Sequence, residues 1–312
     1  MNRLMVFLSL VLMIILCNGC NKNSITIGPN NSLSWTNVGL TNRSIASLFA
    51  SGSNLYAGTD SGAFLSTNNG TNWKSISNGL PTGVISCFIV KDANLFAGTE
   101  NGIYLTTNNG TSWSSSNTGM TIEPEAFAIS GTNLFAATYG GGVFLSTSNG
   151  KSWITVNSGL TNNFVYSLAV SSTNLFAGTN NGVFLSSNNG SSWIAIDSGF
   201  TALNQGGFIV VALAFSGSNL FAGMQGEGLY LSTNNGTSWS IINGIGLCIG
   251  ALAVSGSNIF AGTSYGVFLS TDNGTSWTDI GLDNPSGVLR LAVNDPYLFA
   301  FTGTGGVWRR PI

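Results

Sequence analysis

The chain has 312 residues, of which 43% are hydrophobic and only 6% are charged, with a net charge of −2 and no histidine. This charge balance excludes the basic surface that a nucleic-acid-binding protein uses. The absence of histidine excludes a Ser-His-Asp triad and removes the commonest zinc ligand. We therefore expect no metal site, no cofactor and no nucleic-acid partner.

The first twenty residues, MNRLMVFLSLVLMIILCNGC, contain one arginine and then an apolar run from Leu4 to Leu16. As a helix this run would rise only about 20 Å, which is too short for the ~30 Å core of a bilayer and is typical of a signal peptide. The segment LCNGC that follows resembles a bacterial lipobox, which implies that Cys20 becomes the lipidated first residue. Residues 1–19 are then a lipoprotein-type signal peptide and residues 20–29 a short linker, with plain secretion and an uncleaved anchor as the alternatives.

The other cysteines follow from this assignment. Cys17 would be removed with the signal peptide, which leaves Cys87 and Cys248, each within an apolar segment. We expect these two to be unpaired buried thiols that pack as small hydrophobic residues.

A block that reads NLFAGT, or a close variant, occurs seven times, and the copies begin at Asn54, Asn94, Asn133, Asn174, Asn219, Asn258 and Tyr297. Each copy lies within a fixed order of four short segments, such as VISCFIV, NLFAGT, GIYLTT and SWSSS over residues 84–116. These segments are rich in β-branched and aromatic residues and are bounded by Gly, Asn or Ser, which indicates strands. Four antiparallel strands per repeat, repeated seven times, predict an all-β fold: a single seven-bladed β-propeller over residues 30–312.

The two ends of the chain favour a closed ring over a linear solenoid. The last repeat, residues 287–310, supplies three segments but no fourth. Residues 33–38, within NNSLSWTNVGL, match a fourth segment but have no three segments before them. We therefore predict that the N-terminal strand closes the last blade, which leaves no exposed sheet edge there.

The turn between the third and fourth segments reads STNNGTNW at residues 66–73 and is repeated closely five more times. It resembles the Asp-box, or bacterial neuraminidase repeat, S-x-D-x-G-x-x-W. Its third, fifth and eighth positions are Asn68, Gly70, Trp73; Asn108, Gly110, Trp113; Ser148, Gly150, Trp153; Asn188, Gly190, Trp193; Asn234, Gly236, Trp239; and Asp272, Gly274, Trp277, with a degenerate copy at Trp35. We expect structural roles: an Asx-turn at the third position, a positive φ at the glycine and an apolar anchor at the tryptophan. Because the acid survives only at Asp272, calcium binding is not expected.

The opposite face is where the repeat varies. In a four-stranded meander the second-to-third turns and the links between blades share one face, and loops carried by a rigid frame are common binding sites. The candidate binding residues on this face are Asp60, Glu100, Tyr139, Asn180, Gln225, Glu227, Tyr265, Asp197 and Asp283. The alternative is that they are simply solvated turn residues.

Asp-box propellers include sialidases, xyloglucan-type endoglucanases, sortilin-like receptors and photosystem II assembly factors. The chain looks closest to the assembly factors, whose members have one seven-bladed ring and bind protein partners without catalysis. A sialidase would need an arginine cluster, and the arginines after the signal peptide, Arg43, Arg290, Arg309 and Arg310, are not placed to form one. A two-carboxylate glycosidase would need a pair about 5–10 Å apart, and the candidates for such a pair are Glu100, Glu123, Glu125 and Asp60.

Together these observations predict a monomeric, lipid-anchored and non-enzymatic propeller in a bacterial cell envelope, or a secreted one. Its variable face would bind a protein or a glycan. The alternative is a glycoside hydrolase, sialidase-like or endoglucanase-like, that uses a carboxylate pair on the same face.

Overall fold

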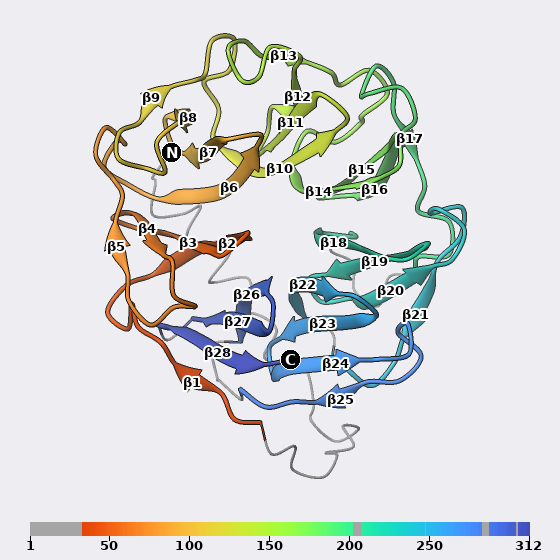
Figure 1. Ribbon diagram of the computed structural model, residues 1–312. Coiled ribbons are helices and arrows are strands. Elements are labelled where there is room, and N and C mark those ends of the chain that lie inside the picture. Colours follow the sequence, from red (N-terminus) through yellow and green to blue (C-terminus); the bar gives the residue numbers. More distant parts are fainter. Residues whose placement is uncertain (1–32, 202–206, 247, 283–286, 304) are drawn as a thin grey trace.

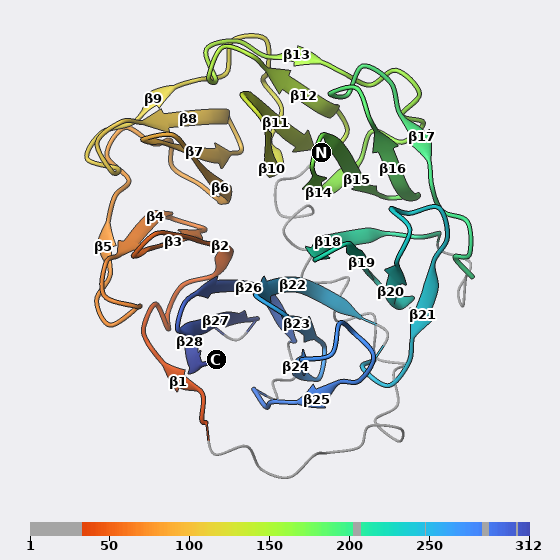
Figure 2. The same ribbon diagram turned by 45° about the vertical axis from the view of Figure 1, so that its right-hand side comes forward.

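The computed structural model describes residues 33–201, 207–246, 248–282, 287–303 and 305–312. In these residues 28 strands form seven four-stranded antiparallel sheets, arranged as blades around a common axis (Figures 1 and 2). The prediction of a seven-bladed β-propeller is thus confirmed. Among the described residues there is no helix long and apolar enough to span a membrane. The predicted signal peptide, linker and lipidation site at Cys20 lie outside the described residues.

Each blade repeats the same four strands from the axis outwards. The innermost strands are β2 (Ile45–Ser51), β6 (Ile85–Lys91), β10 (Pro124–Ser130), β14 (Val165–Ser171), β18 (Val210–Ser216), β22 (Ile249–Ser255) and β26 (Val288–Asn294). The second strands are β3 (Asn54–Thr59), β7 (Asn94–Thr99), β11 (Asn133–Thr138), β15 (Asn174–Thr179), β19 (Asn219–Met224), β23 (Asn258–Thr263) and β27 (Tyr297–Thr302). The third strands are β4 (Gly62–Ser66), β8 (Gly102–Thr106), β12 (Gly142–Ser146), β16 (Gly182–Ser186), β20 (Gly228–Ser232), β24 (Gly266–Ser270) and β28 (Val307–Pro311). The outermost strands are β5 (Lys74–Ser75), β9 (Ser114–Ser115), β13 (Ile154–Thr155), β17 (Ile194–Ala195), β21 (Ser240–Ile242), β25 (Thr278–Asp279) and β1 (Thr36–Asn37).

The ring closes in the seventh blade, where the N-terminal β1 pairs antiparallel with β28 in the order β1-β28-β27-β26. The paired segment is shorter than the predicted 33–38, but it is extended by two backbone hydrogen bonds. Val38 N donates to Val307 O at 2.7 Å, and Val307 N donates to Gly39 O at 2.8 Å. The predicted closure of the last blade by the N-terminal strand is therefore confirmed.

The hydrophobic core lies between neighbouring blades, because both faces of each sheet are apolar. In every second strand the five residues after the first are buried. The aromatic residue at the third position is at most 2% exposed in all seven blades, as Phe96 illustrates at 0%. Burying such a ring contributes roughly 1.5–3 kcal/mol, and adjacent blades supply that burial to one another.

All seven innermost strands carry a β-bulge at the second residue, which the repeat pattern did not predict. The residues left out of the ladder are Ala46, Ser86, Glu125, Tyr166, Val211, Gly250 and Leu289. Bulges redirect a side chain and bend the strand. In this ring they place seven chemically different residues at equivalent positions near the axis.

The turns between third and fourth strands are held by side-chain hydrogen bonds within the turn. In the first blade, Asn68 Oδ1 accepts a hydrogen bond from Asn72 N at 2.9 Å, and Ser66 Oγ accepts one from Gly70 N at 2.9 Å. Gly70 has a φ of 81° and the preceding Asn69 a φ of 55°, so both occupy the left-handed region. At the acidic copy, hydrogen bonds from Ser276 and Ser270 lower the pKa of Asp272 to about 2.

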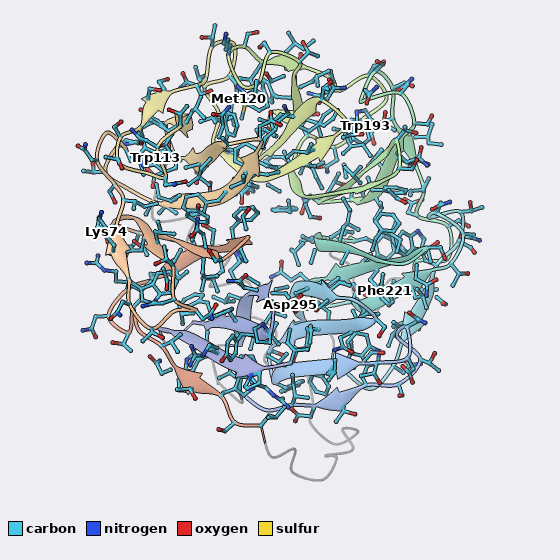
Figure 3. All side chains as sticks on the ribbon, in the orientation of Figure 1. Lys74, Trp113, Met120, Trp193, Phe221 and Asp295 are labelled. Atoms are coloured by element: carbon cyan, nitrogen blue, oxygen red, sulfur yellow. The ribbon has the colours of Figure 1, made fainter. Side chains whose placement is uncertain are left out.

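The tryptophan of each turn also joins neighbouring blades (Figure 3 labels Trp113 and Trp193). In six of the seven blades its Nε1 donates to a backbone carbonyl at the outer edge of the preceding blade. The acceptors are Val38 for Trp73, Ile76 for Trp113, Ser116 for Trp153, Val156 for Trp193, Ile196 for Trp239 and Ile280 for Trp35, at 2.6–3.0 Å. Trp277 differs, because it donates at 3.1 Å to Gly274 O within its own turn.

This difference predicts unequal costs for the same substitution. Trp113→Phe removes the buried hydrogen bond of 2.6 Å from Trp113 Nε1 to Ile76 O, which joins two blades. We expect a loss of about 1–3 kcal/mol in the free energy of unfolding, because the bond is lost and the carbonyl of Ile76 loses this donor. Trp277→Phe removes a bond inside one turn and should cost less. Urea unfolding of the two variants measures the difference, and equal costs would show that the inter-blade bond adds nothing.

The expectation of two unpaired thiols holds for one cysteine only. Cys87 is free and buried, with its Sγ donating to Pro124 O at 3.4 Å. Cys248 is disulfide-bonded, and its partner is not Cys87. An apolar setting in the sequence did not reveal this, because pairing depends on which residue the fold brings near the thiol.

Candidate functional site

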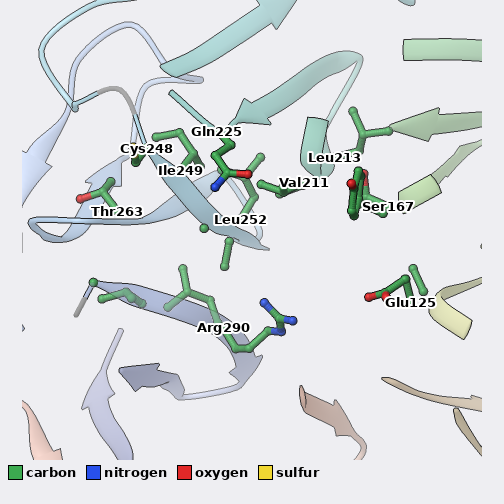
Figure 4. A pocket seen from close by; sticks show the side chains of 18 of the residues that line it. Glu125, Ser167, Val211, Leu213, Gln225, Cys248, Ile249, Leu252, Thr263 and Arg290 are labelled. Atoms are coloured by element: carbon green, nitrogen blue, oxygen red, sulfur yellow. The ribbon is translucent and has the colours of Figure 1, made fainter. Parts of the chain in front are cut away.

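A cavity of about 250 Å³ lies between the innermost strands of the third to seventh blades, on the axis of the ring (Figure 4). Its lining comes from the first halves of these strands and from the ends of second strands, as at Gln225, Thr263 and Ser264. These positions belong to the face that carries the second-to-third turns and the links between blades. We call this space the axial cavity.

Two opposite charges line the axial cavity: Glu125 at the bulge of β10 and Arg290 in β26. Figure 4 shows the charged ends of the two side chains directed toward one another from different blades. Burial raises the pKa of Glu125, and the charge of Arg290 partly offsets that effect. Burial likewise lowers the pKa of Arg290, against the charge of Glu125. Although they interact, these two described residues form no ion pair within 4.0 Å.

Arg290 occupies a position where the other blades have a small residue. The equivalents are Ser47, Cys87, Ala126, Ser167, Ala212 and Ala251. The polar ones bond to the next blade, as when Ser47 Oγ donates to Ile85 O at 2.8 Å. Arg290 also bonds to the next blade, but one residue further along its inner strand: Nε donates to Ala46 O at 2.7 Å, and Nη1 donates to Leu289 O at 2.8 Å. Like Ser47, Arg290 thus joins two blades by a side-chain hydrogen bond, and it also brings a positive charge to the cavity.

Acidic side chains gather on the Glu125 side. Burial, followed by the charges of Glu125 and Glu100, raises the pKa of Glu123 to about 7. Glu123 lies in the link before β10, and Glu100 in the turn between β7 and β8. The second and third blades therefore make one side of the site acidic, and the seventh blade makes the other side basic.

The raised pKa of Glu123 predicts a pH dependence of stability. A carboxyl whose pKa is higher in the folded state contributes stability below its unfolded value, 4.5, and loses it as the pH rises through about 7. The free energy of unfolding of Glu123→Gln should therefore equal that of the wild type at pH 4. At pH 8 it should be higher than that of the wild type by about 1–2 kcal/mol, after allowance for partial exposure. Urea unfolding across this range tests it, with Asp197→Asn as a control for removing an outer-edge carboxylate. A constant difference between wild type and Glu123→Gln at all pH values would contradict it.

Aromatic rings lead from the surface to the axial cavity. Tyr139 and Phe164, which are 37% and 39% exposed, meet edge to face with ring centroids 4.8 Å apart. Tyr139 is also 6.1 Å from Tyr166, which lines the cavity. Burial, with Tyr139 and Glu125 nearby, raises the pKa of Tyr166 well above its ordinary value, so this phenol is neutral and can donate a hydrogen bond.

The structure brings some of the predicted face residues to the axial cavity and leaves others away from it. Gln225 lines the cavity, and Glu100 and Tyr139 interact with groups beside it. The remaining described candidates are exposed Asp60, half-buried Asn180, fully buried Glu227, half-buried Tyr265 and exposed Asp197.

Two of these candidates pack against a glycine. Asp197 follows the outermost strand β17 and lies against Gly182, where an added Cβ would be 3.3 Å from the aspartate. Tyr265 packs in the same way on Gly246. Asp283 lies outside the described residues.

The cavity residues that were not among the sequence candidates include Arg290 and Tyr166. The signal for Arg290 was present, because it is the one long charged residue in a column of small residues. From the sequence alone, Arg290 was considered only as a member of an arginine cluster, and its position in a strand argued against such a cluster. A single arginine is enough to place a positive charge in the cavity. Within the described residues no three acidic, cysteine or histidine side chains are grouped to hold a metal.

These features define a seven-bladed β-propeller with a largely apolar cavity on its axis, lined by one tyrosine and by two oppositely charged residues. No protein-family model and no curated protein matches the chain, but solved structures do. The extracellular domain of BT4673 from B. thetaiotaomicron has a TM-score of 0.76 at 16% identity, over 89% of this chain and 40% of that one. YCF48 bound to D1 peptide has a TM-score of 0.70 at 14% identity, over 93% and 99%.

A third similar structure is the GH74 xyloglucanase from Xanthomonas campestris, with a TM-score of 0.67 at 17% identity over 89% of this chain and 53% of the enzyme. The chain thus spans less than half of the BT4673 domain and about half of the xyloglucanase, but nearly all of YCF48. At these identities the similarity establishes the propeller fold alone, since this fold carries both binding proteins and enzymes.

Proposed function

We propose that this protein is an exported, monomeric and non-enzymatic propeller that binds a partner at the axial cavity. The observation that carries the proposal is that Glu125 and Arg290 lie on two sides of one cavity. At both positions the other blades have uncharged residues. Residues that maintain the blades are nearly identical from repeat to repeat. A charged residue in place of a small one is not needed by the fold, so its charge points to a role in recognition.

Binding to a protein partner accords best with the comparisons. YCF48, which this chain matches over nearly its whole length, was solved with a bound peptide. The exposed Tyr139 and Phe164 beside the cavity supply the amphipathic rings that are enriched where proteins bind. A glycan remains the other occupant that the test must distinguish.

Capture from native envelope extract tests the proposal, using the full chain in wild-type form and as Glu125→Gln and Arg290→Gln. Gln at 290 retains an amide donor for Ala46 O, and both variants should keep the wild-type melting temperature within a few degrees. We expect a partner retained by wild type and by the outer-edge control Asp197→Asn, and lost from both cavity variants. Equal retention by all four proteins would show that the cavity is not the site.

We further propose that the protein is anchored in the cell envelope by lipid on Cys20. The apolar run from Leu4 to Leu16 and the lipobox-like LCNGC support this proposal. The disulfide at Cys248 supports export in general but competes with the anchor, because Cys87 is free and Cys20 is the other cysteine that cleavage would leave. Fatty-acid labelling should be lost in Cys20→Ala and kept in Cys87→Ala. One sulfur cannot carry both a lipid and a disulfide, so peptide mass spectrometry that found Cys20 in a disulfide would reject the anchor and leave a secreted protein.

Glycoside hydrolysis is the second candidate, and the pKa of Glu123 is what favours it. A carboxyl with a pKa of about 7 beside a second carboxyl suits a general acid. An enzyme of this kind should release product from chromogenic glycosides and lose about 100-fold or more of that rate in Glu123→Gln. Our proposal expects no release by the wild type.

A further inference from the structure

We propose that the axial cavity binds a small zwitterion, a molecule with one ammonium and one carboxylate group such as a free α-amino acid or a short peptide. The inference rests on the proposed function of the same cavity and names its ligand class. The ligand's carboxylate would pair with Arg290 and its ammonium with Glu125.

The spacing of the two charges favours a ligand that lies between them. Glu125 and Arg290 are close enough to affect one another's pKa, yet no ion pair within 4.0 Å joins these two described residues. Removing a charge from water without a partner costs several kcal/mol. A ligand with a single charge would pair with one residue and leave the other, which is half-buried, without a partner of opposite charge. A zwitterion satisfies both.

The guanidinium of Arg290 is already positioned by hydrogen bonds. Bonds to Ala46 O and Leu289 O use two of the five N–H donors of the guanidinium. They hold its planar group in one orientation, so a carboxylate can be bound without ordering a flexible side chain. Both acceptors are carbonyls of bulge residues, which explains how the bulges contribute to the site.

The charge around the cavity is asymmetric. Glu123 lies near Glu125 and adds negative potential on that side of the cavity. This favours an ammonium there and disfavours a carboxylate, so the field of the site selects one orientation of a dipolar ligand.

The size and the lining of the cavity limit the ligand that it can hold. At about 250 Å³ the cavity is below the roughly 300–1,000 Å³ typical of pockets for drug-sized ligands. Its walls are largely apolar, with Val211, Leu213 and Leu252 among them, and Tyr166 adds a ring. This space suits an amino acid with an apolar side chain, and it is too small to enclose an oligosaccharide.

Isothermal calorimetry on the full-length protein tests the inference with four probes: L-leucine, leucinamide, N-acetyl-L-leucine and L-leucyl-L-leucine. Leucinamide lacks the carboxylate and N-acetyl-leucine lacks the ammonium, while the dipeptide keeps both groups at a wider spacing. We expect leucine or the dipeptide to bind, and loss of either charge to weaken binding at least about tenfold. Which of the two binds more tightly distinguishes a free amino acid from a short peptide.

Variants assign each charge. Glu125→Gln should weaken binding of leucine and should abolish the difference in affinity between leucine and N-acetyl-leucine. Arg290→Gln should abolish the difference in affinity between leucine and leucinamide. The control Asp60→Asn, on the same face, should leave all affinities unchanged. A simple loss of packing would weaken all probes equally and would overturn the inference.

Failure of this inference can be distinguished from failure of the proposed function. If the wild type binds none of the four probes but retains a protein or glycan in a Glu125-dependent way, the zwitterion is wrong and the binding function stands. If both variants melt at the wild-type temperature and change no binding at all, the two proposals fall together.

Discussion

Deleting residues 33–40 from the full chain should destabilise the whole ring, with at least about 4–5 kcal/mol lost and with aggregation through β28. The deletion removes β1, the hydrogen bonds of Val38 and Gly39 to Val307, and the Trp35 bond to Ile280 O. It also leaves Trp73 Nε1 without its acceptor, Val38 O. Each buried partner left unsatisfied costs about 1–3 kcal/mol, and the losses occur in one place. An exposed β28 would present an edge on which other chains can pair.

Urea unfolding and size-exclusion chromatography measure this effect. A synthetic peptide of residues 33–40 added in trans should restore part of the lost stability, whereas the same peptide with Trp35→Ala should restore less. A deletion variant that remained a monomer with an unchanged melting temperature would show that the ring does not depend on its N-terminal strand.

Gly58→Val should be among the most damaging single substitutions, at about 3 kcal/mol. A Cβ at Gly58 would lie 2.2 Å from Ile85 O and 2.3 Å from Ser47 Oγ, the two atoms of an inter-blade hydrogen bond. Because backbone of the next blade occupies this space, the contact cannot be relieved by rotating a side chain, and overpacking of this kind costs about 1–3 kcal/mol or more. Thermal and urea unfolding test the size of the effect.

A matched control lies at the equivalent position of the third blade, where Ala137 replaces the glycine. Ala137→Gly should cost no more than about 1 kcal/mol, as expected for glycine in a strand. If Gly58→Val destabilised the protein by no more than this, the close approach of the neighbouring blade would not be the reason that position 58 has no side chain.

These two predictions concern features that the blades share, whereas the axial cavity is made from what they do not share. The bulge is present in all seven inner strands, but its residue is Glu125 in one blade and Gly250 in another. A repeated frame with a variable position at the bulge lets the lining of the cavity change while the packing of the blades stays the same.

Much of the architecture could be predicted because its information is local and repeated. Alternating apolar segments and turn residues such as Gly70 recur in each repeat, so a regular fold of seven blades follows from short-range patterns. The unmatched segment around Trp35 likewise predicted which strand closes the ring. Of the residues at or beside the axial cavity, Glu100, Tyr139 and Gln225 were predicted from the sequence as residues of the variable face and Glu125 as a candidate acid.

What the sequence by itself determined is therefore the fold, the closure of the ring and the face on which variation is concentrated. Only the tertiary structure decided that Glu125 and Arg290, 165 positions apart in the sequence, line one cavity, that Asp197 lies at the outer edge, and that Cys248 is disulfide-bonded. The physical reason is that strand patterns depend on neighbours along the chain, whereas a charge pair across the axis depends on how the blades are arranged and on a bulge that shifts each inner strand by one residue.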